Sequence, residues 1–339
     1  MGIVASRVEQ EVQAAIKAVE SEDASAAEKS EMLMEIAMGI QAKPKSSEQI
    51  LSAVELYEKS LAQCPPEQFL LHARIEARMA TALQAIPTNS SEYLERAREC
   101  YDAARAIFKD HGTPEELAET EMNLGLVIQT LCGMNRAVIT DAISAYQRSL
   151  RTFNKKKYPK EFAILQNNLA TAFLSMPFTD QRSKMREALA VQAFEEGLTV
   201  VNIIDHPTEY AMLQNNLGNA LQYSSSSHVV ENNVRALEAY DQALKVRTLQ
   251  TTPFEYANTI SNKANCLLNL PDDPENPESG NEENMAKAIA YYEEAHGIFL
   301  AHNGMQNAEV VAGVLAELKG NRDTSKAANS NANGESQSA

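Results

Sequence analysis

The sequence contains no tryptophan and few of the residues that interrupt helices. Its 339 residues include only 13 glycines and 12 prolines. Both residues are unfavourable inside a helix. Runs of alternating apolar and polar residues, which would indicate strands, are nearly absent, whereas Ala, Leu, Glu and Gln are abundant. The composition therefore predicts an all-α protein.

Cysteines and histidines are also few, and their spacing indicates no site. Four cysteines, at positions 64, 100, 132 and 266, form no Cys-x-x-Cys pair, which argues against a disulfide framework or a zinc site. Six histidines show no His-Glu-x-x-His motif. Glycine-rich phosphate loops and the Gly-x-Ser-x-Gly motif do not occur. We expect a protein that is not an enzyme and has no metal and no cofactor.

Basic residues are in the minority. Lys and Arg number 30 against 46 Asp and Glu, which gives a net charge of −16. Nucleic acids and anionic membranes select for basic surfaces, so neither is an expected partner. No apolar run approaches the roughly 20 residues that cross a bilayer, and no apolar signal core follows Met1. We expect a cytoplasmic protein.

The sequence does contain a segment of about 17 residues that occurs in four similar copies. YPKEFAILQNNLATAFL begins at Tyr158 and HPTEYAMLQNNLGNALQ at His206, while weaker copies begin at Thr113 and Thr252. The prolines that open these copies lie 45, 48 and 46 residues apart. A period in this range is typical of stacked supersecondary units. Each copy is predicted to be the first helix of a pair.

A second helix with its own signature follows each first helix. The signature is an Ala, an aromatic residue four positions later and a small residue three positions after that. These spacings place all three residues on one helical face, where small side chains let a neighbouring helix approach and the ring fills the gap. The six copies are Ala53/Tyr57/Ser60, Ala97/Tyr101/Ala104, Ala142/Tyr146/Ser149, Ala190/Phe194/Gly197, Ala236/Tyr240/Ala243 and Ala288/Tyr292/Ala295.

The two ends of the chain differ from the repeats. Val4, Val8, Val12, Ile16 and Val19 form one apolar stripe over residues 3–19. We expect this stripe to cap the first repeat, with self-association through it as the alternative. We divide the chain into an N-terminal amphipathic capping helix (1–23), six helix pairs (24–302), a C-terminal capping helix (303–319) and a disordered polar tail (320–339), which has no large apolar residue.

Together the two helix signatures resemble the tetratricopeptide repeat superfamily. The first helices carry Leu followed by Ala or Gly, as at Leu169-Ala170 and Leu217-Gly218. The units are longer than the standard repeat of about 34 residues and are similar to the elongated kinesin-light-chain type and to repeats of bacterial signalling proteins. The resemblance covers about residues 24–300. It implies a right-handed α-solenoid of about six elongated helix pairs with a capping helix at each end.

The resemblance also implies a binding groove, because the first helices of such repeats line a concave surface. Asn is unfavourable inside helices, yet it recurs directly before the Leu position. Carboxamides can donate to and accept from an extended peptide backbone; fixing the stacking of the repeats is the alternative role. The candidates are Asn123, Asn168, Asn216 and Asn262, with Asn167, Thr171, Asn215, Asn219, Tyr223 and Asn265 on or near the same face.

Toward the N-terminus the corresponding face carries Arg74 and Arg78 instead. Their spacing of four residues could clamp a carboxylate, and a solvated face is the alternative. The predicted function is a scaffold or adaptor that binds a protein or peptide segment in the groove. The alternative function is an assembly factor or chaperone that uses the same groove to hold a subunit of a larger bacterial enzyme complex.

Overall fold

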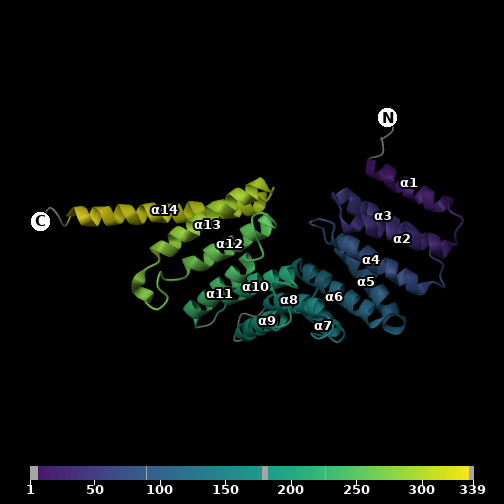
Figure 1. The fold of residues 1–339 in the computed structure, drawn as a ribbon, viewed down its shortest axis with the longest axis horizontal. Helices are drawn as coiled ribbons and strands as arrows, with labels where there is room; N and C mark the ends of the chain where they lie inside the picture. The colour runs from purple at the N-terminus through teal and green to yellow at the C-terminus, as the bar shows by residue number, and fades with distance from the viewer. Residues whose placement is uncertain (1–6, 89, 178–181, 226, 336–339) are drawn as a thin grey trace. The chain divides into compact units, whose positions relative to one another are not determined.

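The computed structural model describes residues 7–88, 90–177, 182–225 and 227–335. Over these residues the chain forms fourteen α-helices and one short 3-10 helix, with no strand (Figure 1). The all-α prediction is confirmed. The helices belong to two compact units, Met1–Met176 and Pro177–Ala339. No helix among the described residues has the length and apolar character needed to cross a bilayer.

Unit 1 is a stack of helices in which neighbours along the chain pack on one another. The predicted pairs are α2 with α3, α4 with α5 and α6 with α7, and each first helix also touches the first helix of the next pair. The bounds are α1 (Arg7–Ser21), α2 (Ala26–Ala42), α3 (Ser47–Gln63), α4 (Phe69–Gln84), α5 (Glu92–His111), α6 (Pro114–Gly133), α7 (Ile139–Ser149) and α8 (Pro159–Leu174).

Unit 2 repeats this arrangement with the pairs α10 with α11 and α12 with α13, after which α14 packs on α13. The division between the units follows Met176, in the connection between the two helices of the expected fourth pair. The bounds are α9 (Arg182–Leu198), α10 (Pro207–Gln222), α11 (Val229–Leu244), α12 (Pro253–Leu268), the 3-10 helix η1 (Pro277–Ser279), α13 (Glu282–Ala301) and α14 (Met305–Glu335).

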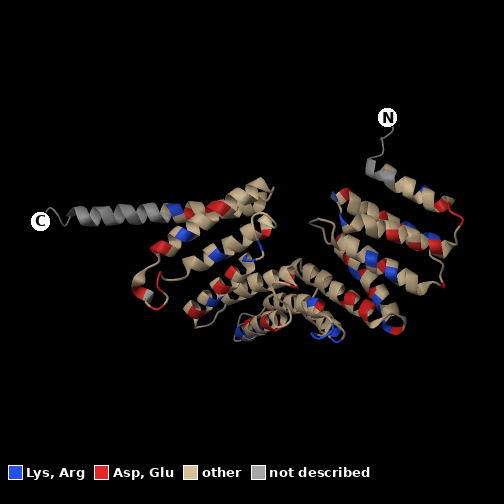
Figure 2. Ribbon diagram, viewed as in Figure 1, with Lys and Arg blue, Asp and Glu red and all other residues tan. Residues whose placement is uncertain are grey.

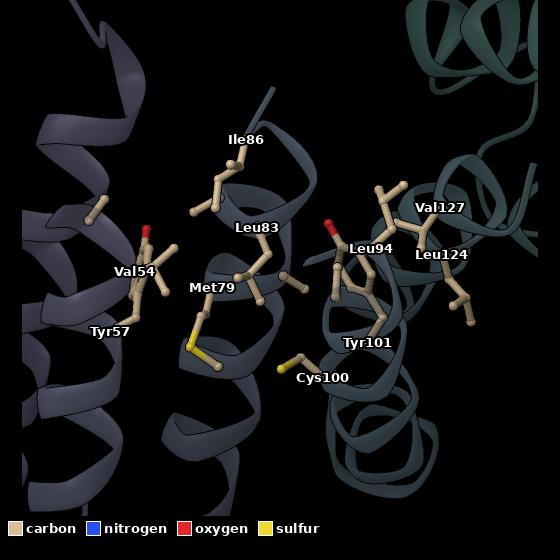
Figure 3. Packing of buried hydrophobic residues seen from close by; sticks show 14 of the residues in the cluster. Val54, Tyr57, Met79, Leu83, Ile86, Leu94, Cys100, Tyr101, Leu124 and Val127 are labelled. Carbon is tan, nitrogen blue, oxygen red and sulfur yellow. The ribbon is translucent and has the colours of Figure 1, made fainter. Parts of the chain in front are cut away.

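The Ala-aromatic-small stripe of the second helices forms the core of the stack, as predicted. Its aromatic residues are almost fully buried, with Tyr57, Tyr146 and Tyr240 at 0% exposure. In unit 1, Tyr57 and Tyr101 lie in one layer with Met79 and Leu83 of α4 between them (Figure 3). Burial of a large aromatic side chain at every pair gives each interface its main apolar contact.

The buried tyrosines also carry a polar contact that the sequence analysis did not predict. Three of these hydroxyls donate to a glutamine of the partner first helix: Tyr57 to Gln41 at 2.7 Å, Tyr146 to Gln129 at 2.8 Å, and Tyr240 to Gln222 at 2.8 Å. These glutamines follow the buried small residues Ala37, Gly125 and Gly218 by four positions. Burial raises the pKa of all three hydroxyls, which keeps them protonated as donors.

Two of the small residues are glycines because a tyrosine ring lies against their backbone. A Cβ added at Gly125 would stand 2.4 Å from Cε1 of Tyr146, and one added at Gly218 would stand 2.6 Å from Cε1 of Tyr240. Both distances are well inside carbon–carbon contact. The Leu-Gly pair of the first helix and the Tyr of the second helix are therefore one packing unit.

Arg247 occupies a position that is apolar in other repeats. It follows the last small residue of its second helix by four positions, where other units have the buried residues Phe108, Phe153 and Val201. Burial lowers the pKa of its guanidinium. Its Nη1 donates to Oγ1 of Thr259 at 3.0 Å, and it forms no salt bridge within the described residues.

Replacing Arg247 by Leu should raise the free energy of unfolding by about 1 kcal/mol, because an apolar side chain removes the cost of burying an unpaired cation. Urea denaturation of both proteins measures the change. Thr259 keeps its bond to Asn215 in this variant, so the neighbouring network remains. A loss of more than about 1 kcal/mol would mean that the guanidinium stabilises the fold through charge.

At the N-terminal end, α1 packs on α2 and α3 through its apolar stripe. Val12, Ile16 and Val19 are buried there, so these three side chains are not available to a second copy of the chain. Val4 lies outside the described residues, and the side chain of Val8 is not described. Self-association through residues 3–19 has to use other positions.

At the C-terminal end, α14 is longer than the sequence predicted. Ala308, Val311 and Leu315 are buried with residues of α12 and α13, and the helix then continues to Glu335. The helix thus includes residues 320–335, for which the sequence indicated a disordered polar tail. This stretch contains no proline, although its two glycines and four asparagines are poor helix formers. Residues 336–339 lie outside the described part.

Candidate partner-binding groove

The candidate residues lie on the first helices, which are α4, α6 and α8 in unit 1 and α10 and α12 in unit 2. The two sets differ in charge. α10 carries one charged residue and α12 carries two, whereas α4 carries three and α6 carries four (Figure 2). The carboxamide face of unit 2 is therefore nearly neutral.

Part of the carboxamide row joins successive first helices. Oδ1 of Asn215, on α10, accepts from Oγ1 of Thr259 at 3.2 Å and from Nδ2 of Asn262 at 3.3 Å, both on α12. Nδ2 of Asn215 donates to Oδ1 of Asn216 at 3.1 Å. Asn215 is buried, so these contacts are shielded from water. At this position the asparagine has the stacking role that was the alternative expectation.

Two more candidates are bonded to tyrosine. Oδ1 of Asn219 lies 2.8 Å from the hydroxyl of Tyr240, and Nδ2 of Asn265 donates to the hydroxyl of Tyr223. Tyr223 is 66% exposed. Asn219 therefore uses its Oδ1 and Asn265 uses its Nδ2 for bonds within the repeats, and the other amide group of each side chain can bond a partner.

The face of α12 keeps unused hydrogen-bonding capacity. Asn258, Asn262 and Asn265 follow one another at spacings of four and three, so they share a helical face. Oδ1 of Asn258 accepts from Asn307 of α14 at 3.2 Å. Within the described residues, Nδ2 of Asn258 and Oδ1 of Asn262 and Asn265 have no partner. The face thus offers both a donor and acceptors.

A cavity of about 380 Å³ opens beside this face, between α12 and α14. Its exposed apolar edge is Val310, which is 64% exposed. We call this cavity the α12 groove. It is lined by Asn258, Ser261, Asn262, Phe299, Gln306, Asn307, Val310 and Val311.

Of the polar residues that line this groove, only Asn262 was predicted from the sequence, and Asn258, Ser261, Gln306 and Asn307 were not. Asn258 had a visible signal, because it precedes Asn262 by one helical turn. The two residues of α14 had none, since the repeat pattern does not extend to that helix.

The candidates of unit 1 are less accessible. Asn167 and Asn168 are both 7% exposed, and Nδ2 of Asn167 donates to Oδ1 of Asn168 at 3.3 Å. Nδ2 of Asn168 is buried without a hydrogen-bond partner. Oγ1 of Thr171 accepts from Gln129 at 3.1 Å. Asn123 is partly exposed and borders a small cavity between α4 and α6.

Arg74 and Arg78 are paired with carboxylates of the next first helix. Nε of Arg74 lies 2.6 Å from Oε1 of Glu116, and Nη1 of Arg78 lies 3.2 Å from Oε1 of Glu119. Burial opposes ionisation of Glu116, but bonds from Arg74 and Thr113 outweigh it and lower its pKa. The cavity beside them is about 40 Å³, room for little more than a water molecule. A partner carboxylate would have to displace these glutamates.

Of two solved structures that match this chain, the first supports the fold. The structure of a Rap protein complexed with competence and sporulation factor matches over 90% of this chain and 79% of that chain, with 11% identity and a TM-score of 0.52. The TPR2AB domain of yeast Sti1 in its complex with pHSP90 matches over 84% of this chain and 99% of that chain, with 16% identity and a TM-score of 0.28. The chain has a tetratricopeptide-type helical repeat fold.

No protein-family model and no curated protein matches the sequence. Among the residues that the structure describes, no group of three or more His, Cys, Asp or Glu side chains could hold a metal ion.

Proposed function

We propose that this protein is a scaffold or adaptor that binds a segment of a partner protein in the α12 groove. The observation that carries the proposal is the set of unused groups on one helical face. Nδ2 of Asn258 and Oδ1 of Asn262 stand beside an open cavity, and Oδ1 of Asn265 lies on the same helical face. An extended backbone presents donors and acceptors in alternation, so it can satisfy both kinds of group whatever its side chains are.

Apolar contacts add to these bonds. Phe299, Val310 and Val311 line the same cavity, and the exposed Val310 can bury its surface against a partner. Neutral hydrogen bonds contribute about 0.5–1.5 kcal/mol each, so three of them with one apolar contact fit a moderate affinity for a flexible segment. The likeness to a Rap protein solved with a bound factor supports a binding role for this fold.

Salt dependence tests the nature of the contact. The partner is first isolated by affinity purification from the native host and identified by mass spectrometry, and its binding segment is then titrated with the purified chain. Raising the salt from about 0.1 M to about 0.5 M should change the affinity less than about threefold, because neutral groups are not screened. A much larger loss would place the contact on charged residues such as Arg74 and Arg78.

The same titration distinguishes a scaffold or adaptor from the alternative function, an assembly factor or chaperone. A scaffold should bind a short synthetic segment nearly as well as the whole partner. An assembly factor or chaperone would require the folded subunit, and the isolated segment would then bind at least about tenfold more weakly.

A further inference from the structure

A second cavity, of about 500 Å³, lies in unit 1 among α5, α6 and α7. Its lining comes from α5, from α7 and the residues that follow it, and from Leu117, Ala118 and Glu121 of the first helix α6, and it includes none of the candidate groove residues. Four cations line it, Arg105, Lys109, Arg148 and Arg151. In a chain with a net charge of −16, such a concentration of positive charge does not follow from composition.

Two of these cations are held in place by carboxylates. Glu121 is buried, and its two oxygens accept from Nε and Nη2 of Arg148, both at 2.7 Å. Arg105 lies 2.9 Å from Asp102 and 3.9 Å from Glu121. The bidentate bond fixes the plane of the Arg148 guanidinium. Asp102 and Glu121 are the only carboxylates in the lining, so they compensate two of the four positive charges.

The other two cations are uncompensated. Lys109 and Arg151 are exposed and line the cavity, and neither side chain has a hydrogen bond or ion pair within the described residues. Leu117, Ala106 and Ala118 supply an apolar wall. The cavity therefore combines two free positive charges, a fixed guanidinium and a surface suited to a nonpolar group.

We propose that this cavity binds a phosphomonoester whose organic group packs on the apolar wall around Leu117. A phosphomonoester carries a charge of about −1.5 to −2 at pH 7 and three acceptor oxygens, which matches the two free cations. A single carboxylate would leave one of them uncompensated. The phosphate belongs either to a small metabolite or to a phosphorylated side chain of a partner, since the chemistry is the same.

Titration of the full chain with phenyl phosphate tests the proposal, with backbone amide NMR as the readout. Phenyl phosphate should bind with a Kd of about 1 mM or tighter and shift the amides of α5, α6 and α7. Benzoate, with the same ring and one charge, should bind at least about tenfold more weakly. Lowering the pH from about 7.5 to about 5.5 should weaken phenyl phosphate, because the second pKa of the phosphate is about 6.

The variant Lys109→Gln with Arg151→Gln should weaken phenyl phosphate by at least about tenfold. Both side chains are exposed and without partners, so the fold should persist. The control Lys17→Gln with Lys59→Gln changes the net charge equally, at two exposed lysines outside the cavity, and should bind as the unmodified chain does. Equal affinity for benzoate, or an unchanged affinity in the double variant, would overturn the proposal.

The affinity of a phosphotyrosine peptide then distinguishes a phosphorylated partner side chain from a small phosphorylated metabolite. Tighter binding of the peptide than of phenyl phosphate would assign the site to a partner side chain, and equal binding would assign it to a small phosphomonoester. Either result supports the cavity as a phosphate site.

Discussion

Replacing Tyr146 by Ala should lower the free energy of unfolding by about 3–5 kcal/mol. Its side chain has 0% exposure, its ring lies against the backbone of Gly125, and its hydroxyl donates to Gln129. Truncation removes the whole ring and leaves a cavity between α6 and α7 that rigid helices cannot close. Urea denaturation of the two proteins measures the difference.

The companion variant Tyr146→Phe isolates the hydroxyl. It should cost only about 1 kcal/mol, the usual contribution of one neutral hydrogen bond, because Gln129 keeps its bond to Thr171. Repeats contact mainly their neighbours, so amide hydrogen exchange in Tyr146→Ala should accelerate first in α6 and α7. A loss below about 1 kcal/mol for the Ala variant would contradict the packing described for the second-helix stripe.

The sequence could predict this stripe because its spacing alone determines the helical face. Spacings of four and three residues admit one arrangement on an α-helix, and the structure buries all six copies. The polar partner of the tyrosines was missed, although Gln41, Gln129 and Gln222 stand at a constant distance from a small residue. Apolar patterns indicate which face is buried, but not which polar group reaches it.

The groove was harder to predict, because the side chain that bonds a groove residue comes from the next repeat, about 40 residues along the chain. Arg74 and Glu116 are 42 residues apart, and Arg78 and Glu119 are 41 residues apart. The partner glutamates lie on another helix, so the residue spacing within α4 cannot reveal these ion pairs. Periodicity likewise placed Asn215 and Asn262 on one face without showing that they bond each other. Which amide group remains free depends on the neighbouring helix, and only the structure shows it.

Removing two asparagines of the α12 groove should cause a large loss of affinity for the partner segment. The double variant Asn258→Ala with Asn262→Ala should weaken binding of the partner segment by about 10- to 100-fold, because it removes two bonds of about 1 kcal/mol each together with the shape of the groove. Its stability should change by less than about 1 kcal/mol, since both side chains are partly exposed and Asn215 keeps its bond to Thr259.

Two single variants serve as matched controls. Asn276→Ala replaces an exposed asparagine of the same unit whose side chain makes no hydrogen bond within the described residues, so neither affinity nor stability should change. Asn215→Ala removes the acceptor of Thr259 and Asn262. It should lower stability by about 1–2 kcal/mol and affect binding much less than the double variant does.

The most direct test of the groove is the affinity of the partner segment, measured by calorimetry beside the unfolding free energy of the same four proteins. We expect the large loss of affinity in Asn258→Ala with Asn262→Ala and the larger loss of stability in Asn215→Ala. If the double variant lost stability while its affinity stayed unchanged, the asparagines of α12 would be stacking residues, and the binding site would lie elsewhere.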